Sequence, residues 1–273
     1  MRAIILNLSA WAVLPFMDTI AKYLSAELSF FQITWARYFF TVFWTLPFMF
    51  IFFRKNLTWS ENPKLQILRG LTLFSANICF FYSISVISMA KALTLAFVAP
   101  LVTTALSPIL LGEKVGIKRW TAVIVGFIGS LVVIRPGFIE FNLATVAALG
   151  TGCLYGVYLI ITRKLHSTDN PLLTLLLTGI VGATVSTFFV PIVWVNPTNI
   201  QWLWLAIMGI FACLGHILLI YSLRYADASK LAPFGYFEII TNIILGYYVF
   251  KDFPDLWTFL GLFIIISSGI YIF

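Results

Sequence analysis

Apolar runs of helix length follow one another along almost the whole of this chain, with short polar breaks between them. About 20 mostly apolar residues are enough to cross the hydrocarbon core of a bilayer. The chain is 61% hydrophobic and only 10% charged, whereas soluble domains carry about 25% charged residues. A soluble fold is therefore excluded. Ten such runs can be delimited, at residues 3–22, 30–53, 64–86, 91–111, 118–135, 142–162, 170–193, 201–222, 229–250 and 256–273.

Continuous apolar runs predict helices, because barrel strands in lipid would alternate between apolar and polar residues. We therefore expect an all-α integral membrane protein with ten transmembrane helices and no soluble domain. The first run resembles a signal peptide, but Asp18 and Lys22 follow it and no small-residue cleavage pattern is visible. We interpret it as a retained span.

The positions of the basic residues predict the orientation. If the N-terminus is cytoplasmic, twelve of the 17 Lys and Arg residues lie at inner ends of spans and four at outer ends. Positive charge gathers on the cytoplasmic side of membrane proteins. We therefore expect both termini in the cytoplasm, in a bacterial inner membrane. The net charge of +7 is explained by this placement, and no nucleic-acid partner is expected.

An internal repeat is visible at an offset of 139 residues, which divides the chain into residues 1–135 and 142–273. Each half contains an odd number of predicted spans, so the second half enters the membrane upside down relative to the first. Inverted repeats of this kind are typical of secondary transporters. The alternative is chance similarity between apolar helices. The polar matches are Tyr82-Ser83 with Tyr221-Ser222, Lys91 with Lys230, and Glu113 with Asp252.

The ends of these half-repeats resemble the drug/metabolite transporter superfamily, in its ten-helix EamA-type branch. The motifs are Leu111-Gly112-Glu113 and the segment 250–254, each before a span that contains two glycines. The segments 232–238 and 67–70 resemble a narrower group that contains S-adenosylmethionine-uptake and organic-anion carriers. Members of that group often carry Arg where Gly235 stands, which leaves the substrate open. The resemblance implies a central cavity between two five-helix bundles, open alternately to each side.

Four ionisable residues lie within the predicted spans: Asp18, Arg37, His216 and Glu238. Charged groups at membrane depth are costly, so they are expected to face a cavity or one another. Glu238 lies about 12 Å in from Lys230 at 1.5 Å per residue. It is a candidate for a substrate cation or a coupling proton, or for a structural pair. Arg37 either binds an anionic group or pairs with Asp18, and His216 is a proton relay or a core residue.

Further candidates follow from the repeat and from depth. Asn77 and His216 are 139 residues apart, so these two polar side chains occupy equivalent positions in the two halves. Asn77 precedes Tyr82, and His216 precedes the matching Tyr221. Lys91 and Lys230 open equivalent spans and are either gating groups or interfacial anchors. A cavity lined by deep aromatic rings would attract a cationic sulfonium or ammonium group. The remaining predicted substrate-binding residues are Tyr82, Tyr221, Tyr236 and Asn242.

No enzyme chemistry is visible. The chain has two histidines, no Cys/His metal spacing and no phosphate-binding loop, so no cofactor or metal is expected. We predict a secondary active transporter for a small polar or amphoteric metabolite, such as an amino-acid-like compound or S-adenosylmethionine. A coupling proton is a possible partner. The alternatives are a carrier of small organic anions and, outside transport, a membrane receptor or scaffold.

Overall fold

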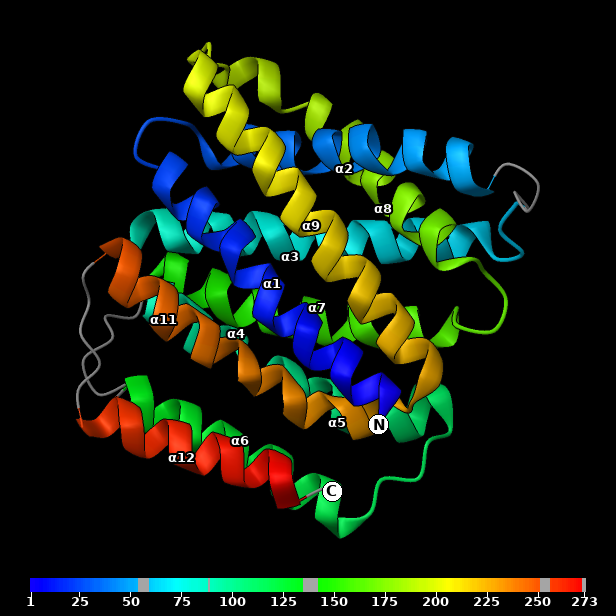
Figure 1. The fold of residues 1–273 in the computed structure, drawn as a ribbon, viewed down its shortest axis with the longest axis vertical. Coiled ribbons are helices and arrows are strands. Elements are labelled where there is room, and N and C mark those ends of the chain that lie inside the picture. Colours follow the sequence, from blue (N-terminus) through cyan, green and yellow to red (C-terminus); the bar gives the residue numbers. More distant parts are fainter. Residues whose placement is uncertain (54–58, 88, 135–141, 251–255, 272–273) are drawn as a thin grey trace.

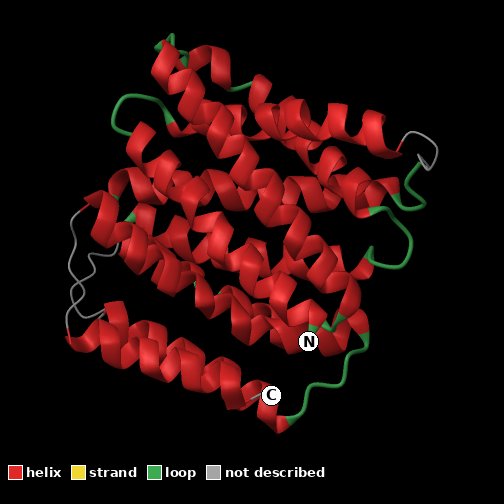
Figure 2. Ribbon diagram, viewed as in Figure 1, coloured by secondary structure: helices red, strands yellow, loops and turns green. Residues whose placement is uncertain are grey.

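The computed structural model describes residues 1–53, 59–87, 89–134, 142–250 and 256–271, and these residues form helices joined by short loops (Figures 1 and 2). In chain order the elements are α1 (Arg2–Leu24), α2 (Phe30–Phe53), α3 (Pro63–Val86), α4 (Met89–Ala96), α5 (Ala99–Leu111), α6 (Ile117–Ile134), α7 (Leu143–Lys164), α8 (Pro171–Thr187), η3 (Val190–Val193), α9 (Asn199–Tyr225), α10 (Ala228–Leu231), η4 (Ala232–Phe237), α11 (Glu238–Phe250) and α12 (Leu256–Tyr271).

Local sequence signals explain several helix ends. A proline occupies the first turn of α3 and of α8, where its missing N–H costs nothing. The side chain of Asn170 accepts a hydrogen bond of 2.9 Å from the backbone of Leu172 at the start of α8. Thr198 and Gln201 form a capping box at the start of α9. Gly112 ends α5 in the left-handed conformation, with φ of 67°, which glycine adopts without steric cost.

Three of the predicted spans are broken rather than continuous, and the run 170–193 divides into α8 and η3. The run 91–111 divides into α4 and α5, and the run 229–250 divides into α10, the 3-10 segment η4 and α11. Pro100 lies in the first turn of α5, and Pro233 in the first turn of η4. Proline removes a backbone donor and clashes with the preceding turn, so neither run continues as one α-helix. The breaks bring irregular backbone to the middle of the molecule.

The element bounds repeat along the chain. Adding 139 to the bounds of α5 gives 238–250, which are the bounds of α11, and the same offset carries α4 onto the segment that contains α10 and η4. Helix contacts also occur in corresponding pairs. Helix α1 packs on α9 as α3 packs on α7, and α2 packs on α9 as α3 packs on α8. Helix α6 packs on α12, its own counterpart, at one edge of the molecule (Figure 1).

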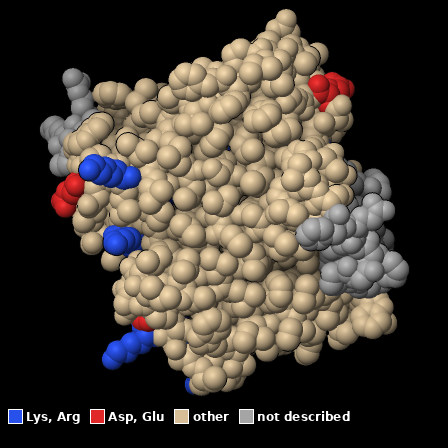
Figure 3. Space-filling view, turned by 180° about the vertical axis from the view of Figure 1, so that it is seen from behind, with Lys and Arg blue, Asp and Glu red and all other residues tan. Residues whose placement is uncertain are grey.

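The outer surface is apolar over most of its extent. In the face shown in Figure 3, the visible charged side chains lie at the margins and the broad middle carries none. Large apolar side chains such as Phe43, Leu203 and Phe263 are exposed there or on other faces. Five helical stretches in the described chain are long and apolar enough to cross a membrane: Arg2–Leu24, Pro63–Val86, Ala92–Leu111, Leu143–Lys164 and Asn199–Tyr225. The count of ten spans stays a prediction.

Candidate functional site

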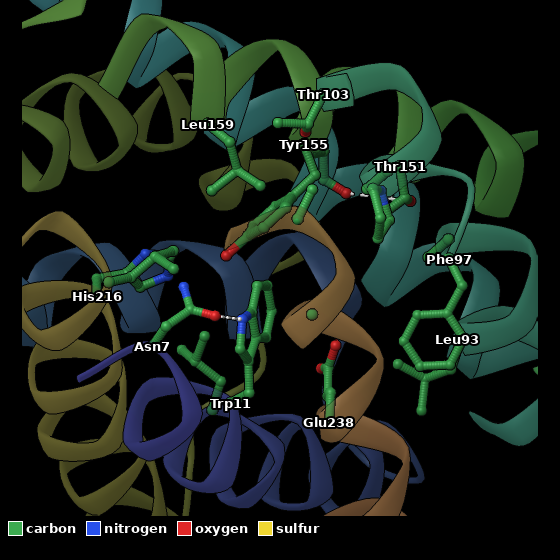
Figure 4. Close-up of a pocket in the computed structure, with 18 of the residues that line it drawn as sticks. Asn7, Trp11, Leu93, Phe97, Thr103, Thr151, Tyr155, Leu159, His216 and Glu238 are labelled. Atoms are coloured by element: carbon green, nitrogen blue, oxygen red, sulfur yellow. Dashed lines mark hydrogen bonds between the residues drawn. The ribbon is translucent and has the colours of Figure 1, made fainter. Parts of the chain in front are cut away.

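A central cavity lies between the two halves of the chain (Figure 4). It contains about 900 Å³ of space between atoms, part of it open to solvent. The first half contributes side chains from α1, α3, α4 and α5. The second half contributes side chains from α7, α9, α10, η4 and α11.

Two carboxylates line this cavity. Asp18 comes from α1 and Glu238 from the first turn of α11, two elements that pack on each other. The Asp18 side chain is 5% exposed, and within the described chain it has neither a hydrogen bond nor an ion pair. The two groups lie close enough to interact electrostatically. Figure 4 shows the Glu238 carboxylate directed into the space beside Trp11.

Aromatic and amide groups line the cavity beside these acids. The Trp11 Nε1 atom donates a hydrogen bond of 2.9 Å to Asn7 Oδ1, and Asn7 Nδ2 donates one of 3.1 Å to the Ser222 hydroxyl on α9. The Asn7 amide therefore holds the indole ring in place. The ring of Tyr155 on α7 lies 6.0 Å from that of Trp11, between centroids. Both rings face the cavity (Figure 4).

Arg37 lies behind the cavity wall and not in it. Its Nη2 atom is 2.6 Å from His216 Nε2, its Nε atom donates to Met17 Sδ at 3.0 Å, and its guanidinium lies over the Tyr38 ring. An arginine offers only donors, so His216 Nε2 accepts and its proton is on Nδ1. That nitrogen faces the Tyr158 hydroxyl at 3.0 Å. His216 is thus a neutral bridge whose ring lines the cavity.

A second buried arginine extends this network. Arg69 is fully buried in the second turn of α3. Its Nη2 atom donates to the Tyr158 hydroxyl at 2.7 Å, and its Nε atom to the Thr162 hydroxyl at 2.8 Å. Its Nη1 atom donates to Thr178 and to the carbonyl of Thr174. Hydroxyl groups, a carbonyl and an aromatic face solvate this cation.

Glu113 contacts a lining residue, Ala228, at one end of the cavity. Its carboxylate accepts hydrogen bonds from the backbone of Ala228 at 2.9 Å and of Ser229 at 3.0 Å, and from the Ser229 hydroxyl at 2.7 Å. Glu113 belongs to the α5–α6 loop, and Ala228 and Ser229 begin α10. Because Ala228 lines the cavity, this contact joins the two halves at the cavity's end.

Two arginines complete this cluster, which we call the Arg163 end. Arg163 Nη1 donates to the carbonyl of Leu223 at 2.8 Å, while its Nε lies 3.4 Å from Glu113 and its Nη2 lies 3.2 Å from Asp227. Arg119 pairs with Asp227 at 3.1 Å and donates to the Ser229 hydroxyl. In the following loop, burial and then the Arg163 charge lower the pKa of His166, so His166 adds no positive charge at pH 7.

The opposite end shows a related contact. Lys22, in the last turn of α1, donates to the carbonyl of Ile84 near the end of α3. Ile84 and Leu223 are 139 residues apart, and each accepts from a basic residue at the end of α1 or α7. At both ends of the cavity, therefore, a basic side chain donates to a backbone carbonyl at the equivalent position of α3 or α9.

The predicted site residues divide into two groups. Asp18, Asn77, His216 and Glu238 all line the cavity. Asn77 donates to the Tyr38 hydroxyl at 2.6 Å and to the Leu73 carbonyl at 2.8 Å.

The other predicted residues lie elsewhere. The ring of Tyr82 packs on Phe30. The Tyr236 hydroxyl donates to the Val123 carbonyl at 3.1 Å, and the Asn242 amide donates to the Glu238 carbonyl. Neither Tyr221 nor the exposed Lys230 is among the residues that line the cavity. The side chain of Lys91 lies outside the described residues.

Helical spacing connects Asp18 with lining residues that were not predicted as substrate-binding residues. Asn7, Trp11, Leu14 and Asp18 recur at intervals of three or four and line the cavity together. The same holds for Thr151, Tyr155 and Leu159 on α7. Among the described residues, no group of three His, Cys, Asp or Glu side chains is placed to hold a metal ion. The described cavity wall consists of aliphatic and aromatic side chains with a few polar ones.

Comparison with known proteins agrees with this arrangement. The EamA-like transporter family matches residues 1–135 and 142–273. The chain belongs to the EamA-like transporter family. It is therefore a multi-pass membrane protein of a family of carriers, as the motifs indicated. A protein of known crystal structure shares the fold, with a TM-score of 0.80 and 18% identity over 98% of this chain and 97% of the other.

Several relatives of this family member have named substrates. An S-adenosylmethionine uptake transporter of Rickettsia bellii is 31% identical over 93% of this chain and 87% of the relative. The protein of the same name from Rickettsia prowazekii is 30% identical over 93% of this chain and 86% of the relative. A riboflavin transporter of Vibrio cholerae is 29% identical over 67% of this chain and 61% of the relative.

Proposed function

We propose that this chain is a secondary active transporter that moves a small polar or amphoteric metabolite by alternating access. The central cavity supports this proposal, because both halves of the chain line it and because it contains titratable groups at membrane depth. A cavity between two halves changes its accessible side when the halves rock against each other. The relatives named as S-adenosylmethionine and riboflavin transporters indicate the size and polarity of the substrate.

We infer that the halves are inverted repeats of five spans each. The matching element bounds and the paired helix contacts support a two-fold relation between residues 1–135 and 142–273. The broken elements around Phe97 and Pro233 fit this scheme, since carriers of this type place substrate at interrupted helices. The distribution of basic residues supports cytoplasmic termini in a bacterial inner membrane.

The Arg163 end is the proposed cytoplasmic gate. Glu113 and Arg119 come from the first half, whereas Arg163, Asp227 and Ser229 come from the second, so the contacts must part when the halves separate on this side. The two pairs made by Asp227 are partly exposed, and ion pairs of that kind are worth little individually. They suit a gate that opens and closes within the turnover time of a carrier.

The energy source is a coupling ion. The sequence has no phosphate-binding loop, so ATP does not drive the cycle directly. We assign the coupling proton to Glu238, whose carboxylate lies in the cavity between α1 and α11. The organic-anion alternative gains no support, because Arg37 does not line the cavity.

Uptake into proteoliposomes tests the carrier proposal. Purified protein is reconstituted and offered radiolabelled S-adenosylmethionine or riboflavin, with and without an imposed proton gradient, and with empty liposomes as the control. Saturable, protein-dependent flux of either compound is the expected result. If a wider panel of metabolites also shows no saturable flux, the chain is a receptor or scaffold and the proposal is wrong.

A further inference from the structure

We propose that the cavity selects substrates that carry a positive charge, and that Asp18 and Glu238 are the residues that select them. This inference rests on the proposed carrier function and adds the charge class of the substrate. It follows from the charges that line the cavity, from the unpaired state of Asp18, and from the aromatic rings beside the two acids.

The charge of the cavity wall is one-sided. Asp18 and Glu238 are acidic, and no described Lys or Arg lines the cavity. The two arginines nearest to it are already engaged, since Arg37 is bonded to His216 and Met17, and Arg69 to hydroxyl and carbonyl oxygens. The described wall therefore offers an anionic substrate no cationic partner.

Asp18 points to a ligand in its own right. Asp18 is only 5% exposed. Within the described chain it nevertheless has no hydrogen bond and no ion pair. A buried carboxylate without a direct hydrogen bond or ion pair is costly in a medium of low polarity. Arg37 attracts Asp18 only from behind the cavity wall, and Glu238 adds a second carboxylate in the same cavity. A cation that enters between the two acids would supply a direct partner inside the cavity.

The neighbouring surface suits the rest of such a molecule. The rings of Trp11 and Tyr155 lie beside the acids and offer faces on which a cation or a flat ring can lie. The Trp11 indole is held by Asn7, and Asn7 by Ser222 on α9, so the ring is fixed before a substrate arrives. A sulfonium or ammonium compound with a planar group fits this combination.

Gly235 keeps the space open. It lines the cavity, and a Cβ atom there would lie 3.5 Å from Pro100 Cγ and 3.6 Å from Trp11 Cζ2, which are ordinary contact distances. A larger side chain is therefore tolerated by the backbone, but it would extend into the cavity or along its wall. An arginine at this position would bring a guanidinium toward the two acids and compete with a cationic substrate.

A pair of compounds isolates the effect of charge. S-Adenosylmethionine and S-adenosylhomocysteine differ by one methyl group, which gives the former its positive sulfonium. In proteoliposomes that transport S-adenosylmethionine, or in thermal-shift titrations of purified protein, we expect the charged compound to bind about tenfold or more tightly than the neutral one. Tetramethylammonium should compete, and small dicarboxylates should not.

Variants then assign the preference to the two acids. Asp18→Asn and Glu238→Gln should each reduce the ratio of affinities for the two compounds severalfold, and Gly235→Arg should lower the affinity for the cation. Glu61→Gln, which removes an exposed acid outside the cavity, should leave the ratio unchanged. The measured quantity is a ratio of two affinities, so it can be interpreted for any variant that folds. If Asp18→Asn does not fold, Glu238→Gln still tests the proposal.

The outcomes separate this inference from the carrier proposal. Absence of flux for every metabolite overturns the carrier proposal. Flux with equal affinity for the charged and neutral compounds, or with preference for an anion, overturns the charge selection and leaves the carrier intact. A preference for the cation that survives both acid substitutions overturns the assignment to Asp18 and Glu238.

Discussion

Arg163 at the end of α7 donates a hydrogen bond of 2.8 Å to the backbone carbonyl of Leu223 near the end of α9. The contact is repeated at the other end of the cavity, where Lys22 donates to the carbonyl of Ile84. The acceptors are related by the 139-residue offset. Only the Arg163 end adds described acidic partners, Glu113 and Asp227. The contact between the helices at the Arg163 end therefore contains more charged groups than the equivalent contact of Lys22.

Arg163→Gln is expected to loosen that closure. The substitution removes the charge that Glu113 and Asp227 share and weakens the bond to Leu223. Cysteine introduced at Leu231, a buried residue that lines the cavity, should then react faster with a membrane-impermeant maleimide. The reaction is measured in a background without the native cysteines, in vesicles of both orientations. Acceleration should appear when the reagent is on the cytoplasmic side.

The neighbouring residue supplies the matched control. Lys164 is exposed, so Lys164→Gln removes the same charge one position away and should leave the labelling rate unchanged. Equal rates in Arg163→Gln and its parent would show that the cluster does not close the cavity. Acceleration only from the opposite side would instead contradict the predicted orientation.

The sequence predicted that ionisable residues inside the apolar runs face a cavity or one another, because their presence in a membrane helix is costly. Asp18, His216 and Glu238 line the cavity, and their roles in binding or coupling stay predictions. Thr34, Arg37, Thr41 and Thr45 recur at intervals of three or four along α2 and are all buried, so the spacing marks an inner face. The sequence did not predict which group Arg37 meets there, because His216 lies 179 residues away in the chain. The burial of Arg69 was missed for a related reason, since its hydroxyl partners on α7 and α8 lie about 90 to 110 residues away in the chain.

The fold, too, was predicted from the sequence only in part. The apolar runs and the offset of 139 predicted where most helices lie. They did not show that the runs 91–111 and 229–250 break into separate elements, although Pro100 and Pro233 mark the breaks. Transmembrane helices tolerate proline when neighbouring groups satisfy the freed backbone. Whether a proline kinks or interrupts a helix therefore depends on tertiary contacts that the sequence does not display.

Arg69→Met is expected to lower the stability of the protein. The substitution removes the Arg69 donors to the Thr162 and Thr178 hydroxyl groups, and each buried acceptor left unsatisfied costs about 1–3 kcal/mol. Arg69→Lys should be intermediate, because lysine keeps the charge but not the planar fork. The melting temperature of detergent-purified protein measures the effect. Lys64→Met, at an exposed position on the same helix, is the control, and an equal melting temperature in Arg69→Met and this control would refute the structural role.

Gly209→Ala tests the packing of α9 against α2. A Cβ atom at Gly209 would lie 2.3 Å from Phe40 Cβ, close to the backbone, where no side-chain rotation relieves the clash. Overpacking of this kind costs about 1–3 kcal/mol, so the melting temperature should fall. At Gly246 the added atom meets nothing within 4 Å. Gly246→Ala should leave the stability unchanged or raise it by under about 1 kcal/mol, through helix propensity. Equal effects of the two substitutions would contradict the close approach.

Glu238→Gln separates coupling from binding. If Glu238 carries the coupling proton, its removal should abolish uptake driven by a proton gradient. Exchange of internal for external substrate needs no net proton movement, so it should persist at saturating substrate concentration, with the Michaelis constant raised by the loss of one acid. Both activities are measured in the same proteoliposomes, with Glu61→Gln as the control for charge removal. Loss of exchange at saturation together with uptake would assign Glu238 to binding or structure alone. Retention of gradient-driven uptake would place the coupling proton on another residue.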